Sequence, residues 1–203
     1  QVTEGLKIGD IDARCEPEHC VTISDKARAV GGGVLEAVSL FGQIYGNYGV
    51  ALLAAGEAKR FGSDKLSEKF QGIPLYRHAL EKLEAFSGLS RVVVTAREAL
   101  AEEAQRLGIH IVENRQPEQG ISHSVSLALQ ELLSQNPDLE GVLFLVCDQP
   151  GIQAATIQKI LNEGCLHKNS IVCAGYDGMR GNPVLWGSTY FQELMHLTGD
   201  TGG

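Results

Sequence analysis

The sequence lacks a long apolar run, a long basic run and a regular set of cysteines. No apolar stretch approaches the roughly 20 residues that span a bilayer, and no signal peptide is recognisable, so we expect no membrane partner. The formal net charge is −8 over 203 residues. Because phosphate backbones need a broad basic surface, we also expect no nucleic-acid partner.

The five cysteines do not form a disulfide framework, since their number is odd and their spacing is irregular. Cys147 and Cys173 lie in apolar, strand-like runs, where a reduced thiol acts as a small apolar side chain. Cys15, His19 and Cys20 have no second pair of ligands at zinc-finger spacing, which disfavours a structural zinc site. We therefore predict a cytoplasmic protein.

The composition shifts near residue 47, and this shift predicts two parts. Residues 1–46 form a short N-terminal appendage that contains three consecutive glycines, and residues 47–203 form the main domain. The chain begins with Gln and ends in the loop-like TGDTGG. We therefore expect both ends to be cut from a longer polypeptide, with the main domain truncated at its C-terminus.

From residue 48 onward, apolar strand-like runs alternate with amphipathic helical patterns. In the run PLYRHALEKLEAF, for example, apolar residues recur at helical spacing and Pro74 stands at the first helical position. This alternation predicts a layered α/β domain with a mainly parallel sheet. Ligands of such sheets bind at the carboxyl ends of the strands, so the residues after Ala55, Asn114 and Val146 are predicted to line one crevice.

The loop after the first predicted strand concentrates positive charge in a net-acidic protein. It carries Lys59, Arg60 and Lys65 among small residues, and a loop in this position can aim backbone N–H groups at an anion. Arg60 offers a planar fork and Lys65 a point charge to phosphate oxygens. The loop matches neither a P-loop nor G-x-G-x-x-G, and a solvated basic turn is the alternative interpretation.

Two further polar segments follow predicted strands. Asp148 closes the run VLFLVC, where a carboxylate can hold the Mg²⁺ of a bound nucleotide, and a turn before Pro150 is the alternative. Gly120, Ser122 and Ser124 follow the run IHIVEN at the start of a helix, where their groups can donate to a phosphate or a polar ring. Ordinary helix capping by one of the two serines is expected whatever the function.

Five segments, in order, resemble the motifs of the molybdenum cofactor nucleotidyltransferases, specifically their cytidylyltransferase branch. They are LLAAGEAKRFGSDKL, PEQGISHSVSLAL, VCDQP, GNPVLW and TGDTGG, and the resemblance covers about residues 48–203. It implies a Rossmann-like three-layer nucleotidyltransferase domain. It also implies transfer of CMP from CTP to the terminal phosphate of molybdopterin or its molybdenum form, with release of pyrophosphate.

The same resemblance implies roles for individual residues. The residues matching the nucleotide site are Leu53, Ala54, Ala55 and Gly56 on the base side and Arg60, Gly62 and Lys65 on the phosphate side. The residues matching the acceptor site are Gly120, Ser122, Ser124 and Asn182. Asp148 and Asp200 match the Mg²⁺ ligands, and the implied catalytic residues are Arg60, Lys65 and Asp148.

The branch assignment rests on Ala54-Ala55-Gly56, because the guanylyl branch tends to have Ala-Gly-Gly there. The chain departs from the family pattern at three other places. Ala58 stands where Ser or Gly is usual, Asn182 where His is frequent, and no Arg follows the final Gly-Asp motif. Guanylyl transfer, activation of a sugar phosphate by the same fold and a non-catalytic cofactor-binding chaperone are the alternatives.

The N-terminal part has a resemblance of its own. The segments GLKIGDIDAR and ISDKARAVGGGVLEAV resemble the C-terminal end of an accessory protein of selenium-dependent molybdenum hydroxylases. This resemblance implies a role in cofactor maturation, with a molybdenum hydroxylase as a partner.

Overall fold

The structure, a computed structural model, describes residues 30–34, 45, 47–56 and 65–200. Contacts divide the chain into two compact units, Gln1–Leu40 and Phe41–Gly203, and each is described by itself. In the first unit, residues 30–34 are helical. The boundary predicted at 46/47 stays a prediction, and Tyr45 packs into the core of the second unit. None of the described helices is long and apolar enough to cross a membrane.

The second unit is built on a six-stranded sheet with the strand order β5-β4-β1-β6-β8-β7. The four parallel strands are β1 (Tyr48–Ala54), β4 (Ser90–Thr95), β5 (His110–Glu113) and β6 (Gly141–Val146). The other two strands are β7 (Ile171–Tyr176) and β8 (Met179–Gly187), and β8 is antiparallel to both of its neighbours. The predicted mainly parallel sheet is therefore confirmed.

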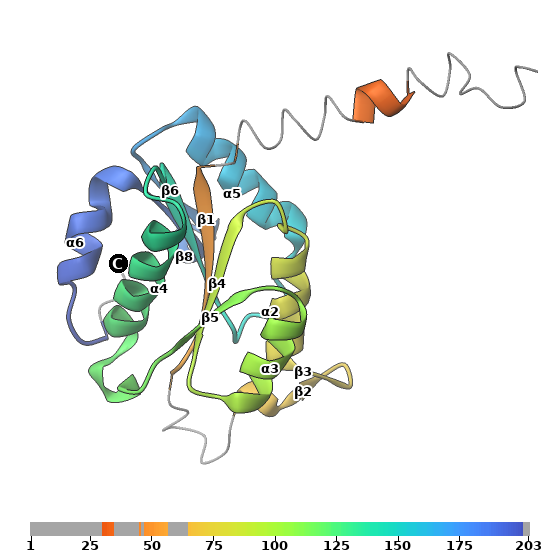
Figure 1. Ribbon diagram of the computed structural model, residues 1–203, viewed down its shortest axis with the longest axis vertical. Helices are drawn as coiled ribbons and strands as arrows, with labels where there is room; N and C mark the ends of the chain where they lie inside the picture. Colours follow the sequence, from red (N-terminus) through yellow and green to blue (C-terminus); the bar gives the residue numbers. More distant parts are fainter. Residues whose placement is uncertain (1–29, 35–44, 46, 57–64, 201–203) are drawn as a thin grey trace, which may run out of the picture. The chain divides into compact units, whose positions relative to one another are not determined.

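Helices cover both faces of this sheet and give three layers (Figure 1). One face carries α2 (Leu75–Glu84), α3 (Glu98–Arg106) and α5 (Ala154–Leu166). The other face carries α4 (Ile121–Gln135) and α6 (Phe191–His196). Alternate residues of β1 enter the two cores, so every residue of this central strand is buried. Burial on both faces explains why β1 reads as a continuous apolar run rather than an alternating one.

Several short elements differ from the predicted pattern. A two-stranded hairpin, β2 (Lys69–Phe70) and β3 (Ile73–Pro74), follows the 3₁₀ turn η2 (Lys65–Ser67). Pro74 is the N-cap of α2 rather than its first residue. After β8, the 3₁₀ turn η4 (Ser188–Tyr190) precedes the short helix α6. Strands of two residues are too short to give a periodic pattern, so the sequence did not predict the hairpin.

Candidate functional site

The carboxyl ends of the four parallel strands meet at one edge of the sheet, which we call the carboxyl edge. Ala54, Thr95 and Glu113 stand side by side in the register, and Val146 is paired with Leu53. The loops that follow these strands therefore leave from the same edge, where ligands of open α/β sheets bind. The segments after β1, β5 and β6 are brought to one edge, as the sequence pattern predicts.

Arg97 holds the end of β1 and the first residues of the loop after it. Its Nη1 donates to the carbonyl oxygen of Ala54 at 2.5 Å, and its Nη2 donates to that of Gly56 at 3.1 Å. The Thr95 hydroxyl accepts the Arg97 backbone N–H at 3.0 Å and donates to the Ala54 carbonyl at 3.4 Å. Arg97 lies outside the five motifs, and its place directly after a strand on this edge is the one signal that could have found it.

The predicted base-binding residues lie in the segment whose backbone carbonyls accept hydrogen bonds from Arg97. Leu53, Ala54 and Ala55 are buried, whereas Gly56 is exposed. Contacts between this segment and a ligand would therefore come from its backbone or from Gly56 rather than from the three buried side chains.

The phosphate side of the predicted nucleotide site is largely outside the described residues. Arg60, Gly62 and Ala58 all lie outside the described residues, and Lys65 is described only as the first residue of η2. The predicted contacts of Arg60, Gly62 and Lys65 with phosphates therefore stay predictions. The Cys15–Cys20 segment also lies outside the described residues.

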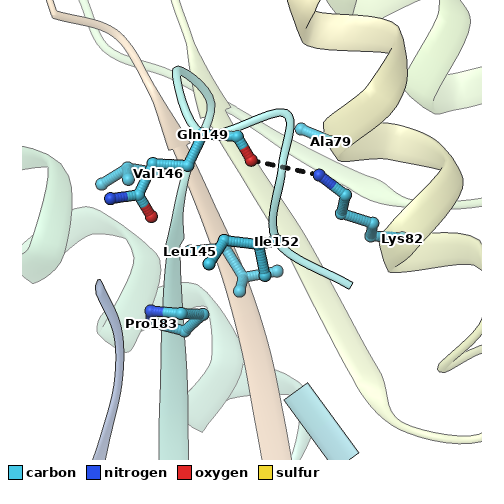
Figure 2. Close-up of a pocket in the computed structure, with 7 residues that line it drawn as sticks. All are labelled: Ala79, Lys82, Leu145, Val146, Gln149, Ile152 and Pro183. Atoms are coloured by element: carbon cyan, nitrogen blue, oxygen red, sulfur yellow. Dashed lines mark hydrogen bonds between the residues drawn. The ribbon is translucent and has the colours of Figure 1, made fainter. Parts of the chain in front are cut away.

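A lysine of α2 anchors the loop after β6. Lys82 Nζ donates to the carbonyl oxygen of Gln149 at 3.1 Å (Figure 2). It also donates to the carbonyl oxygen of Pro150 at 2.8 Å. Burial lowers the pKa of Lys82. Asp148, directly before the two anchored carbonyls, is exposed. The hollow beneath the anchored loop has a volume of about 260 Å³, including space open to solvent, and is lined by Ala79, Lys82, Leu145, Val146, Gln149, Ile152 and Pro183.

Two of the sequence motifs touch at this edge although they lie far apart in the chain. The backbone N–H of Ser122 donates to the carbonyl oxygen of Gly199 at 3.2 Å. Gly120 has a φ of 86°, and a Cβ atom on it would lie 2.3 Å from the Gly199 oxygen and 2.8 Å from Asp200 Oδ1. Only glycine fits at position 120 without a shift of its neighbours. The close approach brings the Asp200 carboxylate against the loop predicted to bind the acceptor.

The expectation that a serine caps α4 is wrong. The N-cap of α4 is Gly120, and no side chain caps the helix. Ser124 Oγ instead accepts a hydrogen bond from Asn114 Nδ2 at 2.9 Å. Ser122, Ser124 and Asn114 are all buried, so the Ser124–Asn114 bond supports the loop from within. A contact of Ser122 or Ser124 with an acceptor stays a prediction.

Asn182 belongs to β8, which returns antiparallel beside β6 and brings its first half to the carboxyl edge. The side chain of Asn182 is half-buried, and Pro183 after it lines the same hollow as Val146. The position of Asn182 is therefore compatible with its predicted acceptor contact, which stays a prediction.

The donor set at this edge fits a hard cation bound together with phosphates. Asp148 and Asp200 are both exposed carboxylates. No group of three or more His, Cys, Asp or Glu side chains that could hold a metal occurs among the described residues. Mg²⁺ commonly takes one or two protein carboxylates and completes its shell with phosphate oxygens and water. A contact of Asp148 or Asp200 with Mg²⁺ stays a prediction.

Comparison with known proteins matches residues 50–203 to the MobA-like NTP transferase domain. A probable molybdenum cofactor guanylyltransferase of Thermococcus gammatolerans is 37% identical over 62 residues, which cover 30% of this chain and 32% of that protein. The bifunctional protein GlmU of Thermobifida fusca is 33% identical over 118 residues, which cover 55% of this chain and 24% of that protein. The chain thus spans about a quarter to a third of these two relatives.

The solved structures give the same fold. Rv0371c of Mycobacterium tuberculosis superposes with a TM-score of 0.62 at 23% identity, and the match covers 77% of this chain and 79% of that one. At this identity the likeness shows the layered α/β fold alone.

Proposed function

Because the chain belongs to the MobA-like NTP transferase family, we propose that it transfers CMP from CTP to the terminal phosphate of molybdopterin or its molybdenum form. An oxygen of the acceptor phosphate forms a bond to the α-phosphorus of CTP, and the bond from that phosphorus to the bridging oxygen breaks. Pyrophosphate leaves with the bonding electrons. The acceptor phosphate is already ionised at neutral pH, so the reaction needs no strong general base.

The contact between the Gly120 loop and the Gly199–Asp200 segment is the observation that carries this proposal. It joins the segment predicted to bind the acceptor to a predicted metal ligand, through the Ser122 N–H bond of 3.2 Å. The second predicted metal ligand, Asp148, follows β6 at the same edge. Nucleotidyl transfer requires such a meeting of acceptor and metal beside the α-phosphate, since the reacting groups must be aligned.

The remaining roles follow from charge. Asp148 and Asp200 would hold Mg²⁺, which offsets the negative charge of the phosphates when it is bound. Arg60 and Lys65 would bind the triphosphate and stabilise the charge that develops on pyrophosphate. The Ala54–Gly56 backbone would receive the base, and Gly120 and Asn182 would border the acceptor.

Two observations favour different nucleotides. Ala54-Ala55-Gly56 supports CTP, by the branch resemblance described above. The name of the Thermococcus gammatolerans relative supports GTP, and guanylyl transfer is therefore the second candidate. We further propose a molybdenum hydroxylase as the recipient of the product, on the resemblance of residues 1–46.

The test is pyrophosphate release by the full chain with molybdopterin, Mg²⁺ and, in turn, CTP, GTP and UTP. We expect turnover with CTP, and a loss of about 100-fold or more in Asp148→Asn, because removing one charge-stabilising group commonly costs that much. Asp138→Asn is the matched control, since this exposed aspartate lies before β6, at the opposite end of the same strand.

Each other outcome has a distinct meaning. Turnover with GTP alone selects guanylyl transfer. Tight binding of molybdopterin without turnover of any nucleotide selects a non-catalytic cofactor carrier. Full activity of Asp148→Asn contradicts the site assignment.

A further inference from the structure

We propose that Arg97 is a positioning residue that fixes the Ala54–Gly56 backbone and thereby biases the site toward a base with hydrogen-bond acceptors on its pairing edge. This inference rests on the proposed function, because it concerns the nucleotide of that reaction. None of the five sequence motifs contains Arg97.

The geometry of the contact requires a guanidinium. Nη1 and Nη2 donate to two carbonyls that flank Ala55, one at the end of the buried strand and one at the exposed start of the loop. A planar fork can hold both carbonyls at once, whereas a lysine ammonium is a single point charge on a flexible stem. The buried Thr95 is paired with Ala54 across β1 and β4, and its hydroxyl accepts the Arg97 backbone N–H. This bond helps to fix the backbone position from which the Arg97 side chain extends.

The contact also changes what the segment offers to a base. The carbonyls of Ala54 and Gly56 are partly used by Arg97, which weakens them as acceptors for a ligand, although each oxygen has a second lone pair. The alanine side chains are buried and apolar. Two of the three carbonyls of the segment are thus engaged, so the segment offers fewer acceptors to a base than it would without Arg97. Cytosine presents two acceptors, O2 and N3, on its pairing edge, whereas guanine presents two donors and one acceptor.

The first measurement needs no nucleotide. We expect hydrogen exchange of the backbone amides around residues 53–56 to be faster in Arg97→Met than in the wild-type chain, with Arg97→Lys in between. The control is Arg106→Met, because Arg106 is exposed and pairs only loosely with Glu102, at 3.4 Å. Exchange that is unchanged in Arg97→Met overturns the positioning role, whether or not the protein is an enzyme.

The second measurement is the dissociation constant of CTP and of GTP, obtained by calorimetry on the same variants. Losing two charge-assisted hydrogen bonds that order the segment is expected to weaken CTP binding about tenfold. GTP binding should change less, so that the ratio of the two affinities moves toward one. Arg97→Lys should recover part of the lost CTP affinity. Equal weakening of both nucleotides, or a wild-type chain that prefers GTP, overturns the bias toward cytosine.

Turnover separates this inference from the proposed function. A chain that binds CTP but releases no pyrophosphate with molybdopterin contradicts the reaction, while the exchange and affinity results still decide the role of Arg97. In an active enzyme, Arg97→Met should raise KM for CTP more than it lowers kcat. A fall in kcat alone, at unchanged KM, would assign Arg97 a different role.

Discussion

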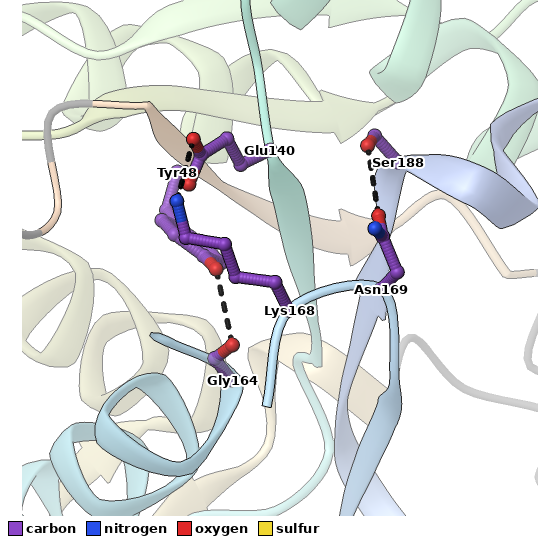
Figure 3. A network of polar contacts seen from close by, with 6 residues as sticks. All are labelled: Tyr48, Glu140, Gly164, Lys168, Asn169 and Ser188. Atoms are coloured by element: carbon purple, nitrogen blue, oxygen red, sulfur yellow. Dashed lines mark hydrogen bonds and ion pairs between the residues drawn. The ribbon is translucent and has the colours of Figure 1, made fainter. Parts of the chain in front are cut away.

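The two ends of the central strands β1 and β6 are held by different polar contacts. At the carboxyl edge, Arg97 and Lys82 donate to backbone carbonyls of the loops that leave β1 and β6. At the opposite edge, which we call the amino edge because the four parallel strands begin there, Lys168 pairs with Glu140 at 2.9 Å, and the Tyr48 hydroxyl donates to the Gly164 carbonyl at 3.1 Å (Figure 3). At the carboxyl ends of β1 and β6, cations therefore hold backbone carbonyls, whereas at the amino ends of these two strands a cation neutralises an acidic side chain and a tyrosine holds a carbonyl.

This difference separates a binding edge from an edge that closes the fold. The cations of the carboxyl edge order the loops, and Asp148 and Asp200 remain exposed there. At the amino edge, the exposed Lys168–Glu140 pair contributes little, because pairs of this kind give about 0–1 kcal/mol. The Tyr48 bond is buried and matters for stability. Damage to the first edge should lower activity, and damage to the second should lower stability.

The largest effect is expected for Gly120→Ala, which tests the carboxyl edge. The new Cβ would meet the Gly199 backbone at 2.3 Å, so one of the two loops must move away from the other. Because this contact positions the Asp200 carboxylate, we expect kcat/KM to fall by about 100-fold. The measurement is pyrophosphate release under saturating Mg²⁺, with unfolding followed in parallel.

Gly178→Ala is the matched control for that variant. Gly178 also has a positive φ, 76°, but a Cβ atom added there would have no neighbour within 4 Å. Both variants place a Cβ atom at a positive φ, but Gly120 also has a ψ of −177°, a region that is essentially confined to glycine, so Gly120→Ala carries the larger backbone penalty and the collision as well. Similar losses of activity in the two would mean that backbone strain alone explains the effect.

Tyr48→Phe tests the amino edge. Tyr48 is 1% exposed, and removing its hydroxyl leaves the Gly164 carbonyl without that bond, which should cost about 1–3 kcal/mol of unfolding free energy. Burial raises the pKa of Tyr48, so its hydroxyl stays a donor throughout the ordinary pH range. We expect urea unfolding at a lower midpoint and unchanged turnover.

The exposed Tyr176, at the end of β7, provides the control for stability. Its replacement by Phe should change the free energy of unfolding by less than about 0.5 kcal/mol. If Tyr48→Phe lowered kcat at unchanged stability instead, the assignment of separate roles to the two edges would be wrong.

Much of the fold could be predicted because burial leaves a direct record in the sequence. β1 and β6 are buried on both faces and read as unbroken apolar runs, while α2 shows its buried stripe at helical spacing. The direction of β8 could not be predicted in this way. A strand has the same pattern in either direction, and its antiparallel return follows from the tight turn at Asp177-Gly178, where both φ values are positive.

The candidate site could be predicted only as far as its motifs. Gly120 and Asp200 each stand in a recognisable segment, but that the two segments touch depends on how α4 and the chain after α6 pack. Arg97 and Lys82 lie outside the motifs, and both bind backbone carbonyls, which are the same group at every residue. Such contacts depend on where the backbone runs, which a single sequence does not record.

The smallest expected effect is a pH dependence of stability that belongs to Lys82. Burial places its pKa in the folded protein below the ordinary value of 10.5, so the folded chain loses this proton at a lower pH than the unfolded chain does. Between the two pKa values the unfolded chain binds more protons, and the free energy of unfolding therefore rises with pH. Glu81 and Cys147 act in the opposite direction and reduce the shift.

Lys82→Met removes this titration together with the two bonds to Gln149 and Pro150. The unfolding free energy of the wild type, minus that of the variant, should rise as the pH increases through the alkaline range toward 10.5. Lys159→Met, on the exposed side of α5, measures the effect of losing a surface charge in the same assay. A difference that falls with pH would mean that the two carbonyls stabilise the ammonium more than burial destabilises it. Lys82 would then act as a paired cation, and its hold on the loop that carries Asp148 would weaken on deprotonation.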